Sequence, residues 1–126
     1  MSSSAVSIVL QVTAGLGLLN VWLVRARSAT SFRGGSSTTL REEFTAYGLP
    51  DWTFYAVGAA KTASAVLLIV GIWAPRVVVP AALVVAALMI GALAMHAKVK
   101  DPLTKSVPAL LMLAAVVGIV VLRINA

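Results

Sequence analysis

Hydrophobic residues in this chain are gathered into four long blocks separated by shorter polar segments. The blocks cover roughly residues 5–24, 52–73, 77–97 and 104–122. An α-helix needs about 20 mostly apolar residues to cross the hydrocarbon core of a bilayer, and each block has about that length. The pattern therefore predicts an all-α fold, a bundle of four transmembrane helices in a multi-pass integral membrane protein.

The composition supports a membrane protein. Hydrophobic residues make up 60% of the chain and charged residues 11%, with a mean hydropathy of +1.00, whereas a soluble domain carries about 25% charged residues. The first block is not typical of a cleaved signal peptide, because no basic segment precedes it and it ends at Arg25 and Arg27. Four helices use nearly all of the 126 residues, so we expect a single transmembrane domain over residues 1–126.

Basic residues are divided unevenly between the two ends of the predicted bundle. The loops after the first and third blocks hold Arg25, Arg27, Arg33, Arg41, Lys98, Lys100 and Lys105, and the other end holds Arg76 and Arg123. Because cytoplasmic loops carry an excess of basic residues, we expect both loops in the cytoplasm and both termini outside the cell membrane. The net charge of +6 then reflects topology and attraction to anionic membrane lipids. It does not indicate nucleic-acid binding, which needs a basic face on a soluble module.

One charged residue, Lys61, lies inside the second block. It follows Trp52 by nine residues, about 13 Å along a helix and near the bilayer midplane. Its amine either extends to the headgroups or faces the bundle interior beside a carboxylate. We favour the interior, because the side chain is too short to leave the midplane easily and intramembrane charges are usually functional. Glu43 is the expected partner, and Glu42 is the second choice.

The loop before the second block should contain a short helix over residues 40–47. Thr39 and Glu42 have the spacing of a capping box, and Gly48 before Pro50 is a typical helix end. Leu40, Phe44 and Tyr47 share one face of this helix. Glu43 flanks that face and Glu42 points away from it.

Other polar residues are candidates for the interior of the bundle. Asn20 shares a helical stripe with Thr13 and Gly17, while Gln11 lies on nearly the opposite face. His96 ends the third block, where it lies either at the interface or in a pocket. Asp101 and Pro102 are expected only to start the fourth helix, and the lysines around them to anchor the loop in the cytoplasm.

Several kinds of chemistry are excluded within the chain. There is no cysteine, so the chain has no thiol redox pair and no thiolate ligands for zinc or an iron–sulfur cluster. With His96 as the only histidine, a site with several histidine ligands is excluded as well, and we expect no metal site.

The segments "EEFTAYGLPDW", "VGAAK", "MIGALAMHAKVKDP" and "KSVPA" resemble the DoxX-like family of small membrane proteins. The resemblance covers essentially the whole chain and implies a four-helix bundle. It leaves the function open, because the family includes subunits linked to thiosulfate:quinone oxidoreduction and partners in oxidative-stress complexes. A wider relative is the receptor assembly chaperone NACHO. Family membership therefore indicates the architecture better than the activity.

Three functions fit these observations, in descending order of preference. In the first, Lys61, Glu43, His96 and Asn20 bind a small lipophilic molecule such as a quinone inside the membrane, in a subunit of a membrane redox system. In the second, the protein is a membrane-protein assembly factor or chaperone whose polar residues contact client transmembrane helices. In the third, the pair of Lys61 and Glu43 only stabilises the bundle. Enzymatic activity and the oligomeric state, a homo-oligomer included, are left open.

Overall fold

The computed structural model describes residues 3–24, 34–35 and 39–125. In these residues the regular structure is entirely helical, with α1 (Ser3–Leu19), α2 (Leu40–Ala46), α3 (Asp51–Val70), α4 (Val78–Lys98) and α5 (Val107–Ile124). Four of the described helical segments are long and apolar enough to span a membrane: Ala5–Leu23, Asp51–Val70, Pro75–Lys98 and Leu103–Ile124. The predicted all-α fold with four transmembrane helices is confirmed.

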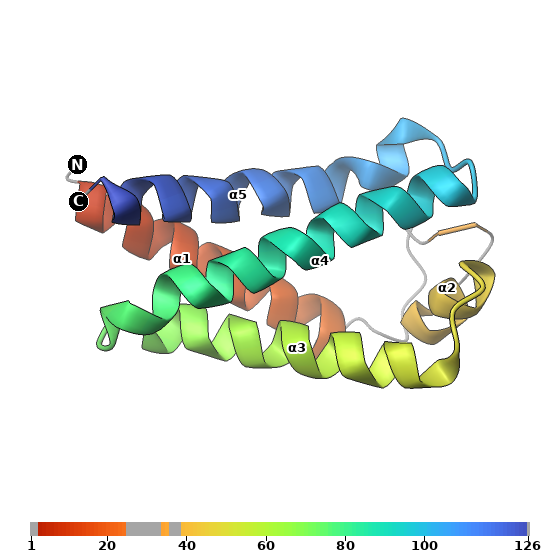
Figure 1. Cartoon of the computed structure of the whole chain (residues 1–126), viewed down its shortest axis with the longest axis horizontal. Helices are drawn as coiled ribbons and strands as arrows, with labels where there is room; N and C mark the ends of the chain where they lie inside the picture. The colour runs from red at the N-terminus through yellow and green to blue at the C-terminus, as the bar shows by residue number, and fades with distance from the viewer. Residues whose placement is uncertain (1–2, 25–33, 36–38, 126) are drawn as a thin grey trace.

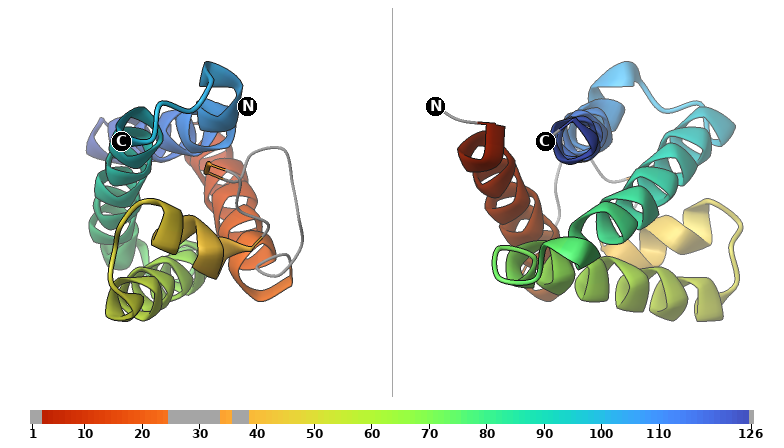
Figure 2. Two further views of the ribbon diagram at one scale, coloured as in Figure 1. Left: turned by 90° about the vertical axis from the view of Figure 1, so that its right-hand side faces the viewer. Right: turned by 60° about the vertical axis from the view of Figure 1, so that its left-hand side comes forward.

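The four long helices form a ring in which α1 packs against α3 and α5, and α4 packs against α3 and α5. Figure 1 shows the start of α1 and the end of α5 at one end of the bundle, together with the connection between α3 and α4. The helix α2 and the connection between α4 and α5 lie at the other end, which we call the loop end. Figure 2 shows α2 lying across this end. The two basic loops thus share one end, as expected, although Arg25, Arg27 and Arg33 lie outside the described residues.

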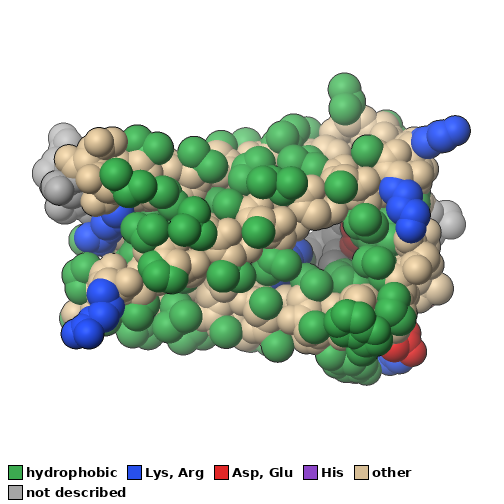
Figure 3. Space-filling model, viewed as in Figure 1, with side chains coloured by type: hydrophobic (Ala, Val, Ile, Leu, Met, Phe, Trp, Pro, Cys, Tyr) green, Lys and Arg blue, Asp and Glu red, His purple; other side chains and the backbone are tan. Residues whose placement is uncertain are grey.

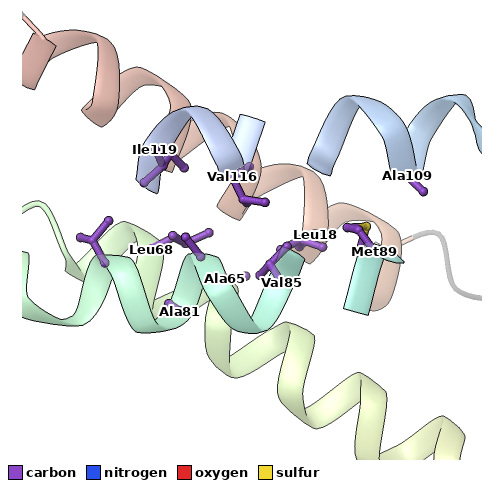
Figure 4. Close-up of a cluster of buried hydrophobic side chains, with 12 residues drawn as sticks. Leu18, Ala65, Leu68, Ala81, Val85, Met89, Ala109, Val116 and Ile119 are labelled. Carbon is purple, nitrogen blue, oxygen red and sulfur yellow. The ribbon is translucent and has the colours of Figure 1, made fainter. Parts of the chain in front are cut away.

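The hydrophobic core lies where small and medium-sized side chains allow the helices to approach closely (Figure 4). On α3 and α4 the fully buried positions include Ala65, Ala81 and Ala82. Gly15 of α1 packs on the backbone carbonyl of Ala65, so even an added methyl group would collide there. Close packing of this kind is typical of membrane helices. The other core side chains are Ala14, Leu18, Leu68, Val78, Val85, Met89, Ala109, Val116 and Ile119.

The inner face of α1 differs from the expected one. Gln11 is fully buried, accepts a hydrogen bond from Ser7 (2.9 Å) and donates one to the carbonyl oxygen of Leu68 (3.0 Å). Thr13 and Asn20 lie on the exposed side of the helix. Of these candidates for the interior, Gln11 is the one that is buried, and its amide finds hydrogen-bond partners inside the bundle.

The short helix in the first loop forms as the sequence predicts. The hydroxyl of Thr39 accepts a hydrogen bond from the backbone N–H of Glu42 at the start of α2. Gly48 follows the helix with a left-handed backbone (φ +77°), a conformation that costs glycine little. Glu43 is buried and Glu42 is exposed, so α2 carries one carboxylate into the loop end of the bundle.

Candidate functional site

A pocket of about 320 Å³ lies between α2, α3 and α4. Its wall on α4 includes the small residues Ala87, Gly91 and Ala92, which leave space between α3 and α4 toward the loop end. Figure 3 shows the surface hollowed between these helices, with charged side chains visible inside the hollow. The lining residues are Glu43, Phe44, Tyr47, Leu49, Thr53, Val57, Lys61, Ala87, Leu88, Gly91, Ala92 and Met95.

Lys61 lines this pocket from the middle of α3. Its ammonium lies 5.3 Å from the ring centroid of Trp22, a distance at which the face of an indole attracts a cation. The negative charge of Glu43 also acts on the ammonium across the pocket. The structure thus directs Lys61 toward the interior and not toward the headgroups.

Trp22 is a site residue that the sequence analysis missed. It lies in a short π-helical turn, η1 (Asn20–Val24), that continues α1, and such turns are frequent at functional sites. Its ring packs against Phe44 and Phe54, with centroid distances of 6.1 Å and 5.3 Å. Gly58 of α3 makes room for it, since a Cβ atom there would lie 2.7 Å from the ring. The signal in the sequence that could have identified Trp22 is its position, as an aromatic residue near the end of the first hydrophobic block.

The expected direct ion pair between Lys61 and Glu43 is not formed. Among the ion pairs of the described residues, the one that includes Glu43 joins its Oε1 to Nε2 of His96 at 4.0 Å. The same oxygen accepts a hydrogen bond of 2.6 Å from the hydroxyl of Tyr47, one turn further along α2. Their spacing along the chain lets these two side chains meet, and it leaves the carboxylate near His96.

His96 is buried at the end of α4, where its Nδ1 lies 2.7 Å from Oδ2 of Asp101. A reversal of the chain produces this contact. Lys100 has a left-handed backbone (φ +58°), and the amide of Asp101 donates to the carbonyl oxygen of His96 (2.9 Å). This is the hydrogen bond of a Schellman motif, which brings the residue after the turn back onto the last turn of the helix.

Asp101 therefore does more than start the fourth helix. Its side chain is only 4% exposed, and it accepts a hydrogen bond of 3.0 Å from the backbone amide of Gly35 in the first loop. Burial alone would raise the pKa of this carboxyl. The hydrogen bonds from His96 and Gly35 and the charge of Lys105 outweigh burial and hold the pKa below its usual range. Asp101 is thus a carboxylate at neutral pH.

Two lysines expected only to anchor the loop also hold this end together. Lys98 donates a hydrogen bond of 2.8 Å to the backbone carbonyl of Tyr47, and Lys105 donates one to the carbonyl of Gly35. Gly34 is buried against the ring of Tyr47, where any Cβ atom would collide with the phenol. The two loops and α2 are therefore joined around the pair of His96 and Asp101.

The structure brings three of the four predicted site residues together. Lys61 and Glu43 line the pocket, and His96 lies behind Glu43. Asn20 is exposed and is not among the residues that line the pocket. Within the described residues no three of the His, Asp and Glu side chains are grouped closely enough to hold a metal ion.

The DoxX-like family model matches residues 16–119. The chain belongs to the DoxX-like family. The match includes every residue of the pocket and the pair of His96 and Asp101. No curated protein and no solved structure matches the chain, so the wider likeness to an assembly chaperone has no support from these comparisons. Together with the four apolar helices, the family makes this a multi-pass membrane protein.

Proposed function

We propose that this DoxX-like protein binds a small lipophilic molecule, such as a quinone, in the pocket between α2, α3 and α4, and that it serves a redox system of the cell membrane. The observation that carries the proposal is the position of Lys61. It lines a largely apolar pocket in the middle of a transmembrane helix. Charged side chains at that depth are costly, and they usually belong to functional sites.

The pocket suits a flat, mostly apolar ring that carries oxygen atoms. At about 320 Å³ it lies at the small end of the range for ligand sites, about 300–1,000 Å³. The ammonium of Lys61 can donate a hydrogen bond to one carbonyl oxygen of such a ring. The hydroxyl of Tyr47 and the carboxyl of Glu43 offer polar partners on the α2 wall. An attached isoprenoid chain could leave through the hollow between α3 and α4 into the lipid.

The protein's own residues supply binding, orientation and proton exchange. The redox chemistry would belong to the quinone when bound, and its electrons to a partner of the membrane system. Because the chain has no cysteine, thiol chemistry in such a system would also belong to the partner.

A binding measurement tests this proposal. The protein in lipid nanodiscs is titrated with a short-chain ubiquinone, and binding is followed by quenching of tryptophan fluorescence. We expect saturable binding that is about 10- to 100-fold weaker in Lys61→Met, because a hydrogen bond to a charged group contributes about 1.5–3 kcal/mol. Arg76→Met, which changes an exposed basic residue in the connection between α3 and α4, is the control. Equal affinity of both variants and the wild type would refute the proposal.

A second candidate function is the binding of a partner's transmembrane helix, as in an assembly factor. Ala87 and Gly91 are four residues apart in the pocket wall, and nothing lies within 4 Å of a Cβ atom built on Gly91. Small residues at this spacing allow another helix to approach closely. This function would be favoured if a membrane protein co-purifies stoichiometrically with the wild type but not with Gly91→Leu, and if no quinone binding is measured.

A further inference from the structure

Buried ionisable groups connect the pocket with the loop end of the protein. Glu43 and Tyr47 form part of the pocket wall, and His96 lies behind them. Asp101 follows, hydrogen-bonded to Nδ1 of the imidazole, and Lys105 lies 3.7 Å from its Oδ1. The side chains of Glu43, His96 and Asp101 are 11%, 7% and 4% exposed. The series therefore leads from the pocket to the loop end through the protein interior.

The carboxylate of Asp101 determines how the imidazole of His96 is used. At 2.7 Å, Nδ1 of His96 donates its hydrogen to Oδ2 of the aspartate. The other ring nitrogen, Nε2, then carries a lone pair and lies 4.0 Å from Oε1 of Glu43, while the hydroxyl of Tyr47 lies 3.5 Å from Nδ1. A shift of about 1 Å would bring Nε2 and Oε1 to hydrogen-bond distance. Tyr47 limits other movements of the carboxylate through its hydrogen bond of 2.6 Å to the same oxygen.

We propose that Glu43 exchanges its proton with water at the loop end through His96. The proton leaves the carboxyl of Glu43 and is taken up by Nε2 of His96, which gives a carboxylate and an imidazolium. The imidazolium next to Asp101 then gives its Nδ1 proton to water at the loop end, which leaves a neutral ring with its hydrogen on Nε2. A ring flip returns the hydrogen to the side of Asp101 for the next transfer. Only O–H and N–H bonds break and form, and no electrons move. His96 is the proton carrier, whereas Asp101 and Tyr47 are positioning residues.

The charges around the path are arranged for this exchange. Oε1 of Glu43 lies 4.0 Å from Nε2 of the imidazole, and Oδ2 of Asp101 lies 2.7 Å from Nδ1. Three lysines lie around these groups. Lys61 acts on Glu43 across the pocket, Lys105 lies beside Asp101, and Lys98 is bound to the backbone of Tyr47. Both carboxylates and ammonium groups therefore surround the path, and the imidazole between them is a group that can accept and release a proton.

The purpose of this path rests on the proposed function. A ligand with quinone chemistry gains or loses protons at its oxygen atoms, and Glu43 is the carboxyl in the pocket wall that can exchange them. The hollow beside the pocket lies among apolar side chains on the surface of helices long and apolar enough to span the membrane (Figure 3). Protons would therefore be exchanged with water on the loop-end side of the membrane, which the basic residues predict to be the cytoplasm.

A pH-jump experiment on the protein without ligand tests the path. Protein in nanodiscs is moved rapidly to low pH, and protonation of Glu43 is followed by time-resolved infrared spectroscopy. The chain has four acidic residues, and the band that disappears in Glu43→Gln identifies this one. We expect His96→Gln to slow protonation of Glu43 by about 100-fold, the low end of what a positioned acid–base group contributes. Tyr55→Phe, which changes an exposed tyrosine, should leave the rate unchanged.

Tyr47→Phe provides a second test that keeps the packing against Gly34. It should slow the same step without changing the final extent of protonation. If His96 and Tyr47 only stabilise the loops, both variants will lower the melting temperature but leave the rate unchanged, and the proposal is then wrong. Since no quinone is present, a failure of ligand binding would not affect this result. If quinone binds normally but the protonation rate of Glu43 is unchanged in these variants, the proton path is wrong and the proposed function still stands.

Discussion

At the scale of single residues, the structure changes the account of how Lys61 is tolerated in the membrane. A charge at the centre of a transmembrane helix costs about 2.5–3.5 kcal/mol on insertion scales. The ring of Trp22 at 5.3 Å can offset about 0.5–2 kcal/mol of this cost. Glu43 forms no ion pair with Lys61, and its carboxylate accepts a hydrogen bond from Tyr47. Lys61→Met therefore leaves the contacts of Glu43 with Tyr47 and His96 in place, and a second change at Glu43 should not raise the stability of that variant.

Asp101 yields a prediction about pH and stability. Its pKa in the folded protein lies below the ordinary value of 3.8, so its carboxylate stabilises the fold above about pH 3.8. That stabilisation is lost as the pH falls through the lower, folded-state pKa. At pH 6 we expect Asp101→Asn to destabilise the protein by about 1–3 kcal/mol, because a buried charged hydrogen bond is weakened.

Thermal melting in detergent between pH 6 and pH 3 measures this effect. The difference between wild type and Asp101→Asn should shrink as the pH falls below about 3.8. Asp51→Asn is the control, since Asp51 forms an exposed ion pair with Arg41 that contributes little. A difference that stays constant over this range would contradict the assigned contribution of the Asp101 carboxylate.

At the scale of helices, glycines decide which elements approach one another. Gly58 and Gly91 both lie in transmembrane helices that line the site, but their surroundings differ. A Cβ atom on Gly58 would lie 2.7 Å and 3.0 Å from ring atoms of Trp22, whereas one on Gly91 meets nothing within 4 Å. The first glycine is required for the contact between α3 and the π-helical turn of η1. The second leaves space in the pocket.

These two positions form a matched pair of substitutions. Gly58→Ala should destabilise the protein by about 1–3 kcal/mol, the usual cost of adding a group to a packed contact. Gly91→Ala should leave stability unchanged or raise it by about 0.5–1 kcal/mol, the helical preference of alanine over glycine. Unfolding in a mixed-micelle denaturant series measures both. Equal effects of the two variants would mean that Trp22 is not packed against Gly58 in the membrane.

At the scale of the whole molecule, the sequence predicts the helices better than the contacts between loops. Hydropathy and capping residues are local signals, so the four transmembrane helices and α2 could be identified from them. Helical periodicity also indicated that Glu43 faces inward. The pair of His96 and Asp101 depends on the left-handed backbone of Lys100, which is uncommon outside glycine. The contact of Trp22 with Lys61 depends on how α1 and α3 pack, and no local pattern encodes that.

The orientation in the membrane is the last prediction. The structure places α2 and the connection between α4 and α5 at the same end of the bundle. The excess of basic residues therefore lies on one side of the membrane. We expect that side to be cytoplasmic. The chain lacks cysteine, so a single introduced thiol reports on one place. Asn125→Cys, exposed at the end of α5, should react with a membrane-impermeant maleimide in intact cells, whereas Lys100→Cys should react only after permeabilisation. The opposite pattern would place the loop end, and with it the proposed proton exchange, outside the cell.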